Sequence, residues 1–401
     1  MQDGLFITGL GAISAAGHNA ESVAETYASC ATRIRPRQTL GQPTAVAALS
    51  RETEQALTDF IQANPRYEDL DRSVKLALYA ARQATLESRW QPTGDHFGIC
   101  LGSSRGATGL LERYHADFLA TGARRTASLT SPTTTLGNLS SWVAQDVQSH
   151  GPTTEISSTC STSIYAVGTA LAWLRAGMAR RFLAGGAEAP LTDFTVAQMQ
   201  ALRIYSRDPT AAFPCRPCAT DQGKRNSMVL GEGACLLTLE RLESDELAAR
   251  PTPPLARVNG AGFCVEPITT NTSLSLEGRA LSHSMRQALA DAGLDTVDLV
   301  VTHTPGTALG DQSELNALRD VFGDSLPILT SNKWILGHTL GASGALGIEY
   351  ALYALRTQRY ADYPYPVPFT NHPRPIRVVM VNAVGFGGNA GTVIVSSPSA
   401  R

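Results

Sequence analysis

The chain of 401 residues has little charge and no long hydrophobic run. Charged residues make up 17% and apolar residues 43%, which is ordinary for a soluble globular protein. No apolar stretch reaches the roughly 18 residues that a membrane helix needs, and the first ten residues lack the basic and apolar segments of a signal peptide. The formal net charge of −2 gives no reason to expect nucleic-acid binding. We therefore expect a cytoplasmic protein with no membrane span and no nucleic-acid partner.

The seven cysteines are odd in number and scattered, which argues against a disulfide framework in a chain of this size. Cys215 and Cys218 form a single C-x-x-C pair without a second pair or a nearby histidine, so the pattern does not favour a zinc site. We expect no bound metal and expect most thiols to be buried packing residues.

Two stretches of the chain follow the same plan. Each begins with a short apolar strand that closes on glycines, near residues 5 and 255, and each continues into helices and further strands. The segment Arg250–Pro254 holds three prolines and cannot be helical, so we interpret it as a connector. We expect one half at residues 1–254 and a related half at 255–401.

The first glycine pair, in Gly9-Leu10-Gly11, resembles the start of a dinucleotide-binding fingerprint. The third glycine of that fingerprint is replaced by Ser14, and the expected acidic residue further on is missing. A tight turn from strand to helix is the better interpretation.

Helical and strand-like segments alternate along the chain, which predicts an α/β protein with buried sheets. The expected helices cover residues 73–88, 163–178, 278–292, 311–321 and 344–356. The expected strands cover residues 96–102, 181–187, 298–302, 326–330, 377–382 and 390–395.

Cys160 is the first candidate for chemistry. It lies in a run of small polar residues between an apolar strand and a long helix. A helix N-terminus carries about half a positive charge, so we expect it to lower the pKa of the thiol and favour the thiolate. Backbone N–H groups at such a turn are also suited to bind an oxyanion.

Two histidines also occupy junctions where functional groups concentrate. His303 ends an apolar strand, and His338 lies in a glycine-rich segment five residues after Lys333. Asp311 and Glu314 follow on an opening helical turn, where they are expected to pair with that lysine. The glycines of the loop 385–389 are suited to close backbone approach.

These segments, taken in order, resemble the elongating beta-ketoacyl-acyl-carrier-protein synthases over residues 4–397. The resemblance rests on the segments 158–163, 185–188, 229–234, 303–311, 332–344 and 385–389. It implies the thiolase-like fold, with two related α/β halves in five layers, αβαβα. It also implies an acyltransferase that joins malonyl-carrier protein to an acyl chain held on Cys160, in fatty-acid, polyketide or aryl-polyene assembly.

The resemblance also implies a role for each site residue. Cys160 takes the acyl chain, and His303 and His338 drive decarboxylation and stabilise the enolate. The backbone N–H groups of Cys160 and Phe386 form an oxyanion hole, with Phe386 also acting as a gate. Lys333, beside Glu314, orients His338.

Further expectations concern substrate delivery and partners. Thr307 is expected to contact the pantetheine arm of acyl carrier protein, and no separate cofactor is implied. Carrier proteins are acidic, so the basic residues Arg124, Arg125 and Arg207 are candidates for the docking face. The family forms dimers through the first half, and the partner is either an identical chain or a related synthase chain.

The sequence departs from the family pattern at two places. The usual His-Gly-Thr-Gly-Thr is His-Thr-Pro-Gly-Thr at residues 303–307, and the usual Asp-Gly-Phe after Arg225 is Asn226-Ser-Met228, preceded by extra residues around 218–223. Both changes lie where the family binds the pantetheine arm, so the shape of that binding tunnel is expected to differ here. They also favour a specialised pathway over housekeeping fatty-acid synthesis.

Two other functions use the same fold. A non-catalytic partner subunit of the chain-length-factor type usually lacks the cysteine, which is retained here together with both histidines and Lys333. A stand-alone decarboxylase or acyltransferase is a third possibility. A cysteine in the C-terminal loop, typical of biosynthetic thiolases, is absent. The sequence therefore favours carrier-linked condensation.

Overall fold

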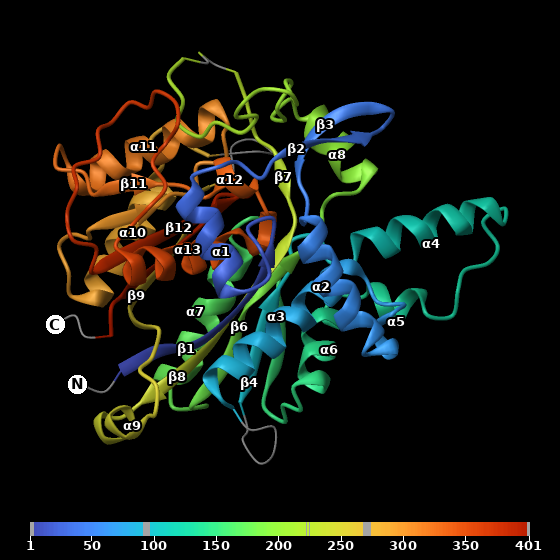
Figure 1. Ribbon diagram of the computed structural model, residues 1–401, viewed down its shortest axis with the longest axis horizontal. Coiled ribbons are helices and arrows are strands. Elements are labelled where there is room, and N and C mark those ends of the chain that lie inside the picture. Colours follow the sequence, from blue (N-terminus) through green and yellow to red (C-terminus); the bar gives the residue numbers. More distant parts are fainter. Residues whose placement is uncertain (1–3, 91–96, 222, 224, 268–273, 399–401) are drawn as a thin grey trace.

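The computed structural model describes residues 4–90, 97–221, 223, 225–267 and 274–398. Ten of the described strands join in one sheet, and helices cover its faces (Figure 1). The strand order is β11-β10-β12-β13-β9-β1-β8-β6-β4-β5. Strands β1, β4, β5, β6 and β8 therefore occupy one side of this sheet, and β9 to β13 occupy the other.

The first side of the sheet has three parallel strands followed by two antiparallel ones. Parallel β5, β4 and β6 are followed by β8, which is antiparallel to β6, and by β1, which is antiparallel to β8. The bounds are β1 Gly4–Ser14, β4 Gly98–Gly102, β5 Thr153–Ile156, β6 Arg181–Glu188 and β8 Gly233–Leu242.

The second side repeats this topology. Parallel β11, β10 and β12 are followed by β13, antiparallel to β12, and by β9, antiparallel to β13. The bounds are β9 Ala256–Val265, β10 Leu299–Val301, β11 Ile328–Thr330, β12 Val378–Gly385 and β13 Asn389–Ser396. A short antiparallel pairing of Leu5–Ile7 with Ala256–Val258 joins the two sides. The two sides therefore have the same arrangement of parallel and antiparallel strands, as predicted for two related halves.

Helices form three layers around the two sides. Helix α3 (Arg72–Ser88) packs on β1 and β8, and α10 (Arg279–Ala292) packs on β9 and β13. Between the sides, α7 (Thr162–Arg175) packs on β4 and β6, while α13 (Ser343–Thr357) packs on β12 and touches α7. The result is the expected five-layer arrangement, with α7 and α13 as the buried middle layer.

The glycines of β1 and β9 allow these outer helices to approach. A Cβ on Gly9 or Gly11 would collide with the backbone of α3, and one on Gly260 or Gly262 would collide with that of α10. The predicted tight turn at Gly9 is wrong, because β1 continues to Ser14. The two glycine pairs mark the same contact in each half, where only hydrogen fits beneath the helix.

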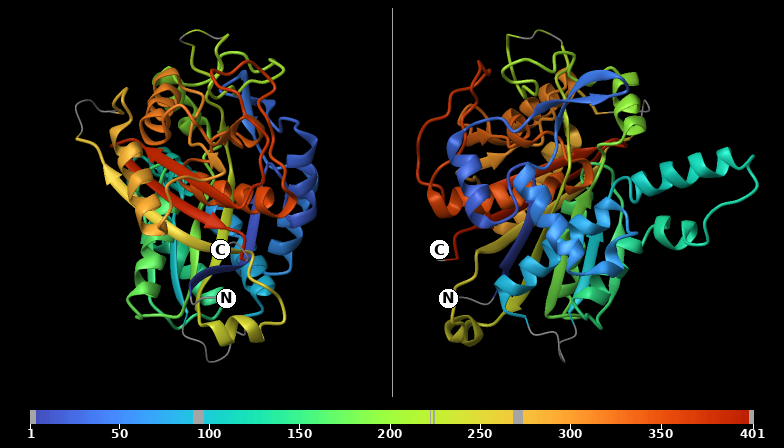
Figure 2. Two further views of the ribbon diagram at one scale, coloured as in Figure 1. Left: turned by 90° about the vertical axis from the view of Figure 1, so that its left-hand side faces the viewer. Right: turned by 45° about the vertical axis from the view of Figure 1, so that its right-hand side comes forward.

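The remaining elements surround this body. Helix α4 projects from it as an arm (Figures 1 and 2), and a hairpin of β2 and β3 pairs with β7 in a small sheet. Their bounds are α1 Ala20–Ser29, β2 Arg35–Thr39, β3 Gln42–Ala47, α2 Arg51–Gln62, α4 Thr108–Ala120, α5 Thr130–Thr134, α6 Asn138–Asp146, α8 Asp193–Ala201, β7 Leu230–Gly231, α9 Ser244–Ala249, α11 Ala308–Phe322 and α12 Lys333–Leu336, with short 3-10 helices at Pro65–Tyr67 and Leu340–Ala342.

The predicted helices and strands are confirmed, with ends shifted by a few residues. The predicted strand 96–102 begins at Gly98, and residue 96 lies outside the described residues. Gly293 caps α10 in the left-handed conformation, as expected for a C-terminal glycine. Within the part of the chain that the structure describes, no helix combines the length and apolarity required to cross a membrane.

Candidate active site

Cys160 lies on a tight, strained turn between β5 and α7. Thr159, a β-branched residue, has a left-handed φ of 52°, which costs free energy and is typical of functional turns. The turn is closed by hydrogen bonds from Thr162 Oγ1 to Thr159 O (2.6 Å) and from Ser158 N to Thr162 Oγ1 (2.8 Å). Cys160 is buried, with 9% of its surface exposed, immediately before the N-terminus of α7.

The expected lowering of the Cys160 pKa is wrong for the resting protein. Burial and, to a smaller extent, the charge of Glu188 together raise the pKa of the thiol to about 12. Lys333 and the backbone N–H groups of Phe386 and Cys160 act in the opposite direction but do not compensate. Desolvation of the thiolate therefore outweighs the helix N-terminus, and the thiol is protonated at neutral pH.

His303 lies two residues beyond the end of β10, and Glu314 on α11 holds its backbone. Glu314 Oε1 accepts from the His303 N–H (3.0 Å) and Oε2 from the Thr304 N–H (2.7 Å). The Asn382 amide also donates to Glu314 Oε1 (3.0 Å). One buried carboxylate thus fixes the peptide that carries the imidazole.

His338 is held by backbone contacts instead. Its N–H donates to Val229 O (2.7 Å), and its carbonyl accepts from the Gly231 N–H (3.0 Å), which adds it to β7 as an isolated bridge. Leu340, two residues later, has a left-handed φ of 44°. The segment 229–234, part of the family resemblance, therefore positions the second histidine.

The two imidazoles face each other, with ring centroids 5.1 Å apart and planes at 86°. Burial lowers the pKa of His338 to about 3, and burial also lowers the pKa of His303 well below its usual value, with the Lys333 charge adding to both effects. Among the residues that the structure describes, neither Nδ1 has a hydrogen-bond partner. Both rings are therefore neutral, and each keeps one N–H to donate.

Lys333 is the charged neighbour that these groups share. Its ammonium is buried and donates to Thr302 O at 3.4 Å. Burial lowers its pKa to about 8, while Glu314, Cys160 and other groups raise it. The expected direct pairing with Glu314 or Asp311 is not found among the described residues, because Glu314 is occupied by backbone N–H groups. Lys333 acts on its neighbours through space.

Asp311 connects two loops of the site. Its carboxylate accepts from the N–H groups of Cys218 (2.8 Å) and Gly306 (3.0 Å). Burial raises the pKa of this carboxyl to about 7. Asp311 therefore ties the segment around Cys218, where the sequence departs from the family pattern, to the loop after His303.

Phe386 lies beside the cysteine turn, as expected. Thr159 Oγ1 donates to Phe386 O at 3.0 Å, and a Cβ on Gly385 would lie 2.7 Å from Cys160 N. Because Gly385 has no side chain, its backbone can lie directly against the turn that carries Cys160. Phe386 is 37% exposed, and its role as a gate stays a prediction.

Thr307 is half-buried at the start of α11. Its hydroxyl oxygen accepts from the Gly310 N–H (3.3 Å) as the helix N-cap, which leaves the hydroxyl proton for a ligand. Asn226, in the altered segment, accepts from the Ala308 N–H at 2.9 Å. The departure at Asn226 therefore supports the same helix end.

The candidate docking residues lie on exposed segments. Arg124 and Arg125 follow α4 in the chain, and Arg207 follows α8. Within the described part of the chain no contact joins Arg207 to the other two, and a common docking face for all three stays a prediction.

An apolar cluster around Cys160 was not identified from the sequence. It comprises Val196, Met199, Tyr205, Met228, Leu230 and Leu340. These residues come from α8, β7, the segment between those two elements and the 3-10 helix Leu340–Ala342, so no local pattern marks them. Met228 replaces the phenylalanine of the family pattern here, and the flexible thioether suits adaptable packing.

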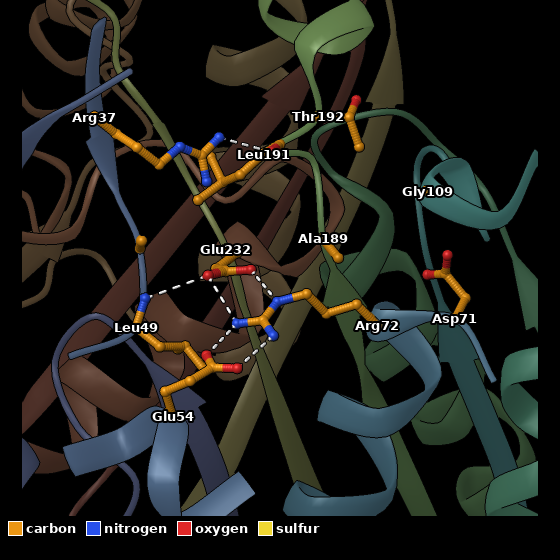
Figure 3. Close-up of a pocket in the computed structure, with 11 residues that line it drawn as sticks. Arg37, Leu49, Glu54, Asp71, Arg72, Gly109, Ala189, Leu191, Thr192 and Glu232 are labelled. Carbon is orange, nitrogen blue, oxygen red and sulfur yellow. Dashed lines mark hydrogen bonds and ion pairs between the residues drawn. The ribbon is translucent and has the colours of Figure 1, made fainter. Parts of the chain in front are cut away.

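A separate cavity of about 280 Å³ is lined by residues of β2, α2 and α3, among others (Figure 3). Arg72 spans it between two carboxylates, with Glu54 at 2.6 Å and Glu232 at 2.6 Å. Glu232 also accepts from the Leu49 N–H (3.3 Å). The glutamate of the segment 229–234 is thus neutralised by Arg72 and anchors the chain next to β7.

The sheet topology and the middle helices place the chain in the thiolase-like class. Solved structures agree on the fold. The ishigamide ketosynthase/chain length factor superposes with a TM-score of 0.84 at 24% identity, covering 99% of this chain and 100% of that one. A ketosynthase complex with a type II PKS acyl-carrier protein gives 0.85 at 21%, covering 99% and 100%.

Family models identify the chain more closely. Residues 3–245 match the beta-ketoacyl synthase N-terminal domain, and residues 255–363 match the C-terminal domain. A 3-oxoacyl-[acyl-carrier-protein] synthase 2 from Staphylococcus aureus is 27% identical over 407 residues, covering 97% of this chain and 99% of the relative. The chain belongs to the beta-ketoacyl synthase family, and the resemblance found in its motifs is confirmed.

Proposed function

We propose that the chain is a catalytic beta-ketoacyl synthase that carries its acyl intermediate on Cys160. The observation that carries this proposal is the pair of neutral, buried imidazoles of His303 and His338, which share Lys333 as a charged neighbour with Cys160. A non-catalytic partner subunit has no need of such a pair.

The first half-reaction transfers the acyl chain. The Cys160 sulfur, once deprotonated, attacks the thioester carbonyl of an acyl-carrier protein, and the pantetheine thiol leaves with the proton. The N–H groups of Cys160 and Phe386, both near the sulfur, are suited to stabilise the oxyanion of this step.

The second half-reaction forms the carbon–carbon bond. Malonyl-carrier protein loses CO₂, and the electron pair of the broken carbon–carbon bond stays on the remaining acyl group as an enolate. The enolate oxygen accepts hydrogen bonds from the N–H groups of the two imidazoles. The enolate carbon attacks the acyl thioester on Cys160, releasing the thiolate and the ketoacyl product. Neutral imidazoles suit this step because they donate to the enolate oxygen without needing a metal.

The partners follow from the relatives. One neighbour is described as a ketosynthase/chain length factor and another as an acyl-carrier protein in complex with its ketosynthase. We extend both interactions to this chain, with acyl carrier protein as substrate carrier and a second synthase chain, identical or related, as dimer partner. The cytoplasmic location, the absence of a separate cofactor and the division at residue 254 belong to the same proposal.

Intact-mass measurement tests the proposal. The wild type and Cys160→Ala are incubated with a series of acyl-carrier-protein thioesters, followed by malonyl-carrier protein. We expect an acyl adduct on the wild type, lost as ketoacyl product after malonyl addition, and no adduct on Cys160→Ala. Cys30→Ala, which removes an exposed thiol, is the matched control and should behave as the wild type.

Other outcomes would redirect the assignment. The absence of any adduct across chain lengths would favour the partner-subunit alternative and prompt a search for a second chain by co-purification. An adduct that malonyl-carrier protein does not discharge would indicate acyl transfer alone, and the Thr304-Pro305 segment would be examined first.

A further inference from the structure

Arg105 lies in the turn after β4, and the mechanism above gives it no role. It is half-buried, its Nη2 donates to Oε1 of Gln198 on α8, and its buried Nε has no hydrogen-bond partner among the described residues. No carboxylate in the described ranges forms an ion pair with its guanidinium. Because a guanidinium stays charged in proteins, Arg105 carries a positive charge and an N–H donor that these residues leave unpaired.

The backbone of Arg105 is held in place by Glu188, at the end of β6. The Glu188 carboxyl accepts from the N–H groups of Ser104 (2.8 Å) and Arg105 (3.2 Å). Ser103 Oγ donates to the same carboxyl at 2.8 Å and accepts from the Gly106 N–H at 2.9 Å. Every residue of the turn 103–106 thus takes part in one hydrogen-bonded unit, which fixes the direction from which the Arg105 side chain starts.

This turn lies directly against the segment that carries Cys160. A Cβ on Gly102, the last residue of β4, would lie 2.2 Å from Thr162 Cγ2, and Thr162 follows Cys160 by two residues. On its other side the turn meets the 3-10 helix 340–342, because a Cβ on Gly341 would lie 2.6 Å from Ser104 N. The first residue of that 3-10 helix belongs to the apolar cluster around Cys160.

The Arg105 side chain reaches from this turn to the helix that forms another part of the cluster. Gln198, which it binds, stands beside Met199 on α8 and two residues after Val196. Met199 and Val196 are both buried members of the apolar cluster around Cys160. The guanidinium therefore lies at the edge of the cluster, between two elements that contribute to it or support it.

Apolar side chains beside this pair are uncovered. Phe194 precedes Gln198 by one helical turn and is 58% exposed. Leu136 is 66% exposed, and its Cδ2 would lie 3.3 Å from a Cβ on Gly106. The guanidinium and the Gln198 amide thus offer N–H donors next to apolar surface. Such a combination suits a ligand whose carbon chain ends in a carboxylate.

We propose that Arg105, assisted by Gln198, is a specificity-determining residue that binds a terminal carboxylate on the acyl chain held by Cys160. The acyl substrate is then the half-thioester of a dicarboxylic acid. A guanidinium matches a carboxylate in geometry and charge, whereas a methyl-ended chain would bury the cation without a partner. The inference rests on the condensing function proposed above and adds the class of its acyl substrate.

Matched pairs of substrates test the inference. Carrier-protein thioesters of equal chain length are offered, hexanoyl with adipoyl and octanoyl with suberoyl, and adduct formation on Cys160 is followed by intact mass with Cys160→Ala as background. We expect the wild type to take the dicarboxylic member of at least one pair about tenfold faster, since hydrogen bonds to charged groups are among the strong ones. Arg105→Leu should lose this preference or reverse it.

Two further variants separate the guanidinium from charge in general. Arg105→Lys keeps a cation without the planar array of donors, so it should retain a reduced preference. Arg113→Leu is the matched control, because Arg113 lies exposed on the neighbouring helix α4, with its guanidinium 5.4 Å from the centre of the Tyr114 ring. Its loss removes one positive charge near the turn and should leave the wild-type preference unchanged.

Equal rates for both members of every pair in the wild type, or an unchanged preference in Arg105→Leu, would overturn the inference. It is also overturned if Arg105→Leu changes the oligomeric state and keeps the preference, because Arg105 then pairs with a second chain. If Arg105→Leu does not fold, Arg105→Lys and Gln198→Leu decide, since both should weaken the preference. A wild type that forms no adduct with any thioester contradicts the condensing function itself, and the inference falls with it.

Discussion

Glu314 and Glu349, two of the buried glutamates in the second half of the molecule, have surroundings that differ sharply. Glu314 on α11 is 0% exposed and accepts from two backbone N–H groups and an asparagine amide. Glu349 on α13 is 3% exposed, and the hydrogen bond recorded for its carboxyl comes from Tyr27 Oη at 2.9 Å. Burial desolvates both carboxyl groups, but only Glu314 accepts several hydrogen bonds.

The comparison shows how donors decide what a buried carboxyl does. Burial raises the pKa of both groups, to about 7 for Glu349, while for Glu314 the N–H groups and Lys333 oppose the rise. Glu314 is therefore suited to fix a catalytic peptide through the hydrogen bonds that it accepts. Glu349 is bound by Tyr27, whose ring also contacts Tyr350 and Tyr353, and its raised pKa favours the neutral form and a packing role.

The largest effect is expected at Glu314. Glu314→Ala removes the acceptor of the His303 and Thr304 N–H groups, so the imidazole loses its fixed position. Displacement of a catalytic group by about 1 Å costs on the order of a hundredfold in rate. We expect malonyl-dependent discharge of the acyl adduct to fall by about that factor, measured by single-turnover mass spectrometry, with adduct formation retained.

Glu314→Gln refines this prediction. The carboxamide keeps one oxygen acceptor, so either His303 N–H or Thr304 N–H stays bound and the loss should be smaller. Equal losses in both variants would mean that the charge of Glu314, and not its hydrogen bonds to the peptide, is what the site requires.

A smaller effect is expected at Lys333, which links Glu314 to the nucleophile through space. Lys333→Met removes the charge that lowers the pKa of Cys160, so alkylation of the thiol near pH 7 should slow about tenfold. Lys333 has a pKa of about 8, so its charge is present below that pH and lost above it. The ratio of wild-type to variant rates should accordingly decline as the pH rises through about 8.

Lys75→Met provides the control for this measurement. Lys75 lies on α3 and its ammonium donates to Glu68 O at 2.7 Å, so its removal should leave the alkylation profile unchanged. A constant ratio of wild-type to Lys333→Met rates across pH would contradict the assigned titration of Lys333.

The sequence predicted the catalytic residues better than their surroundings. Cys160, His303 and His338 stand in ordered motifs, and the helices of the second half have clear apolar spacing. Glycine patterns were misread at Gly9, because the helix that requires the small residue is about 70 residues away in the chain. The hydrogen-bond donors to Glu188 come from the segment 103–105 and from Gly341. The apolar cluster around Cys160 also comes from separate parts of the chain. Only folding brings either set of residues together.

The smallest effect on activity is expected at Glu349, where the comparison instead predicts a change in stability. Its folded pKa of about 7 lies above its ordinary value. A raised pKa contributes stability that is fully present below the unfolded pKa and is lost as pH rises through the folded pKa. Ionisation of Glu349 should therefore cost roughly 3 kcal/mol of unfolding free energy between pH 5 and pH 8.

Glu349→Gln should remove this pH-dependent loss while condensation continues at the wild-type rate. Thermal or urea unfolding gives the change in unfolding free energy between pH 5 and pH 8 for each protein. The change in the wild type minus the change in Glu349→Gln is the contribution of Glu349. Tyr27→Phe should enlarge the loss, because the tyrosine hydroxyl is the donor that lowers the Glu349 pKa. If Glu349→Gln retained the wild-type pH dependence, the carboxyl would not be the group that titrates, and the contrast between the two glutamates would not hold.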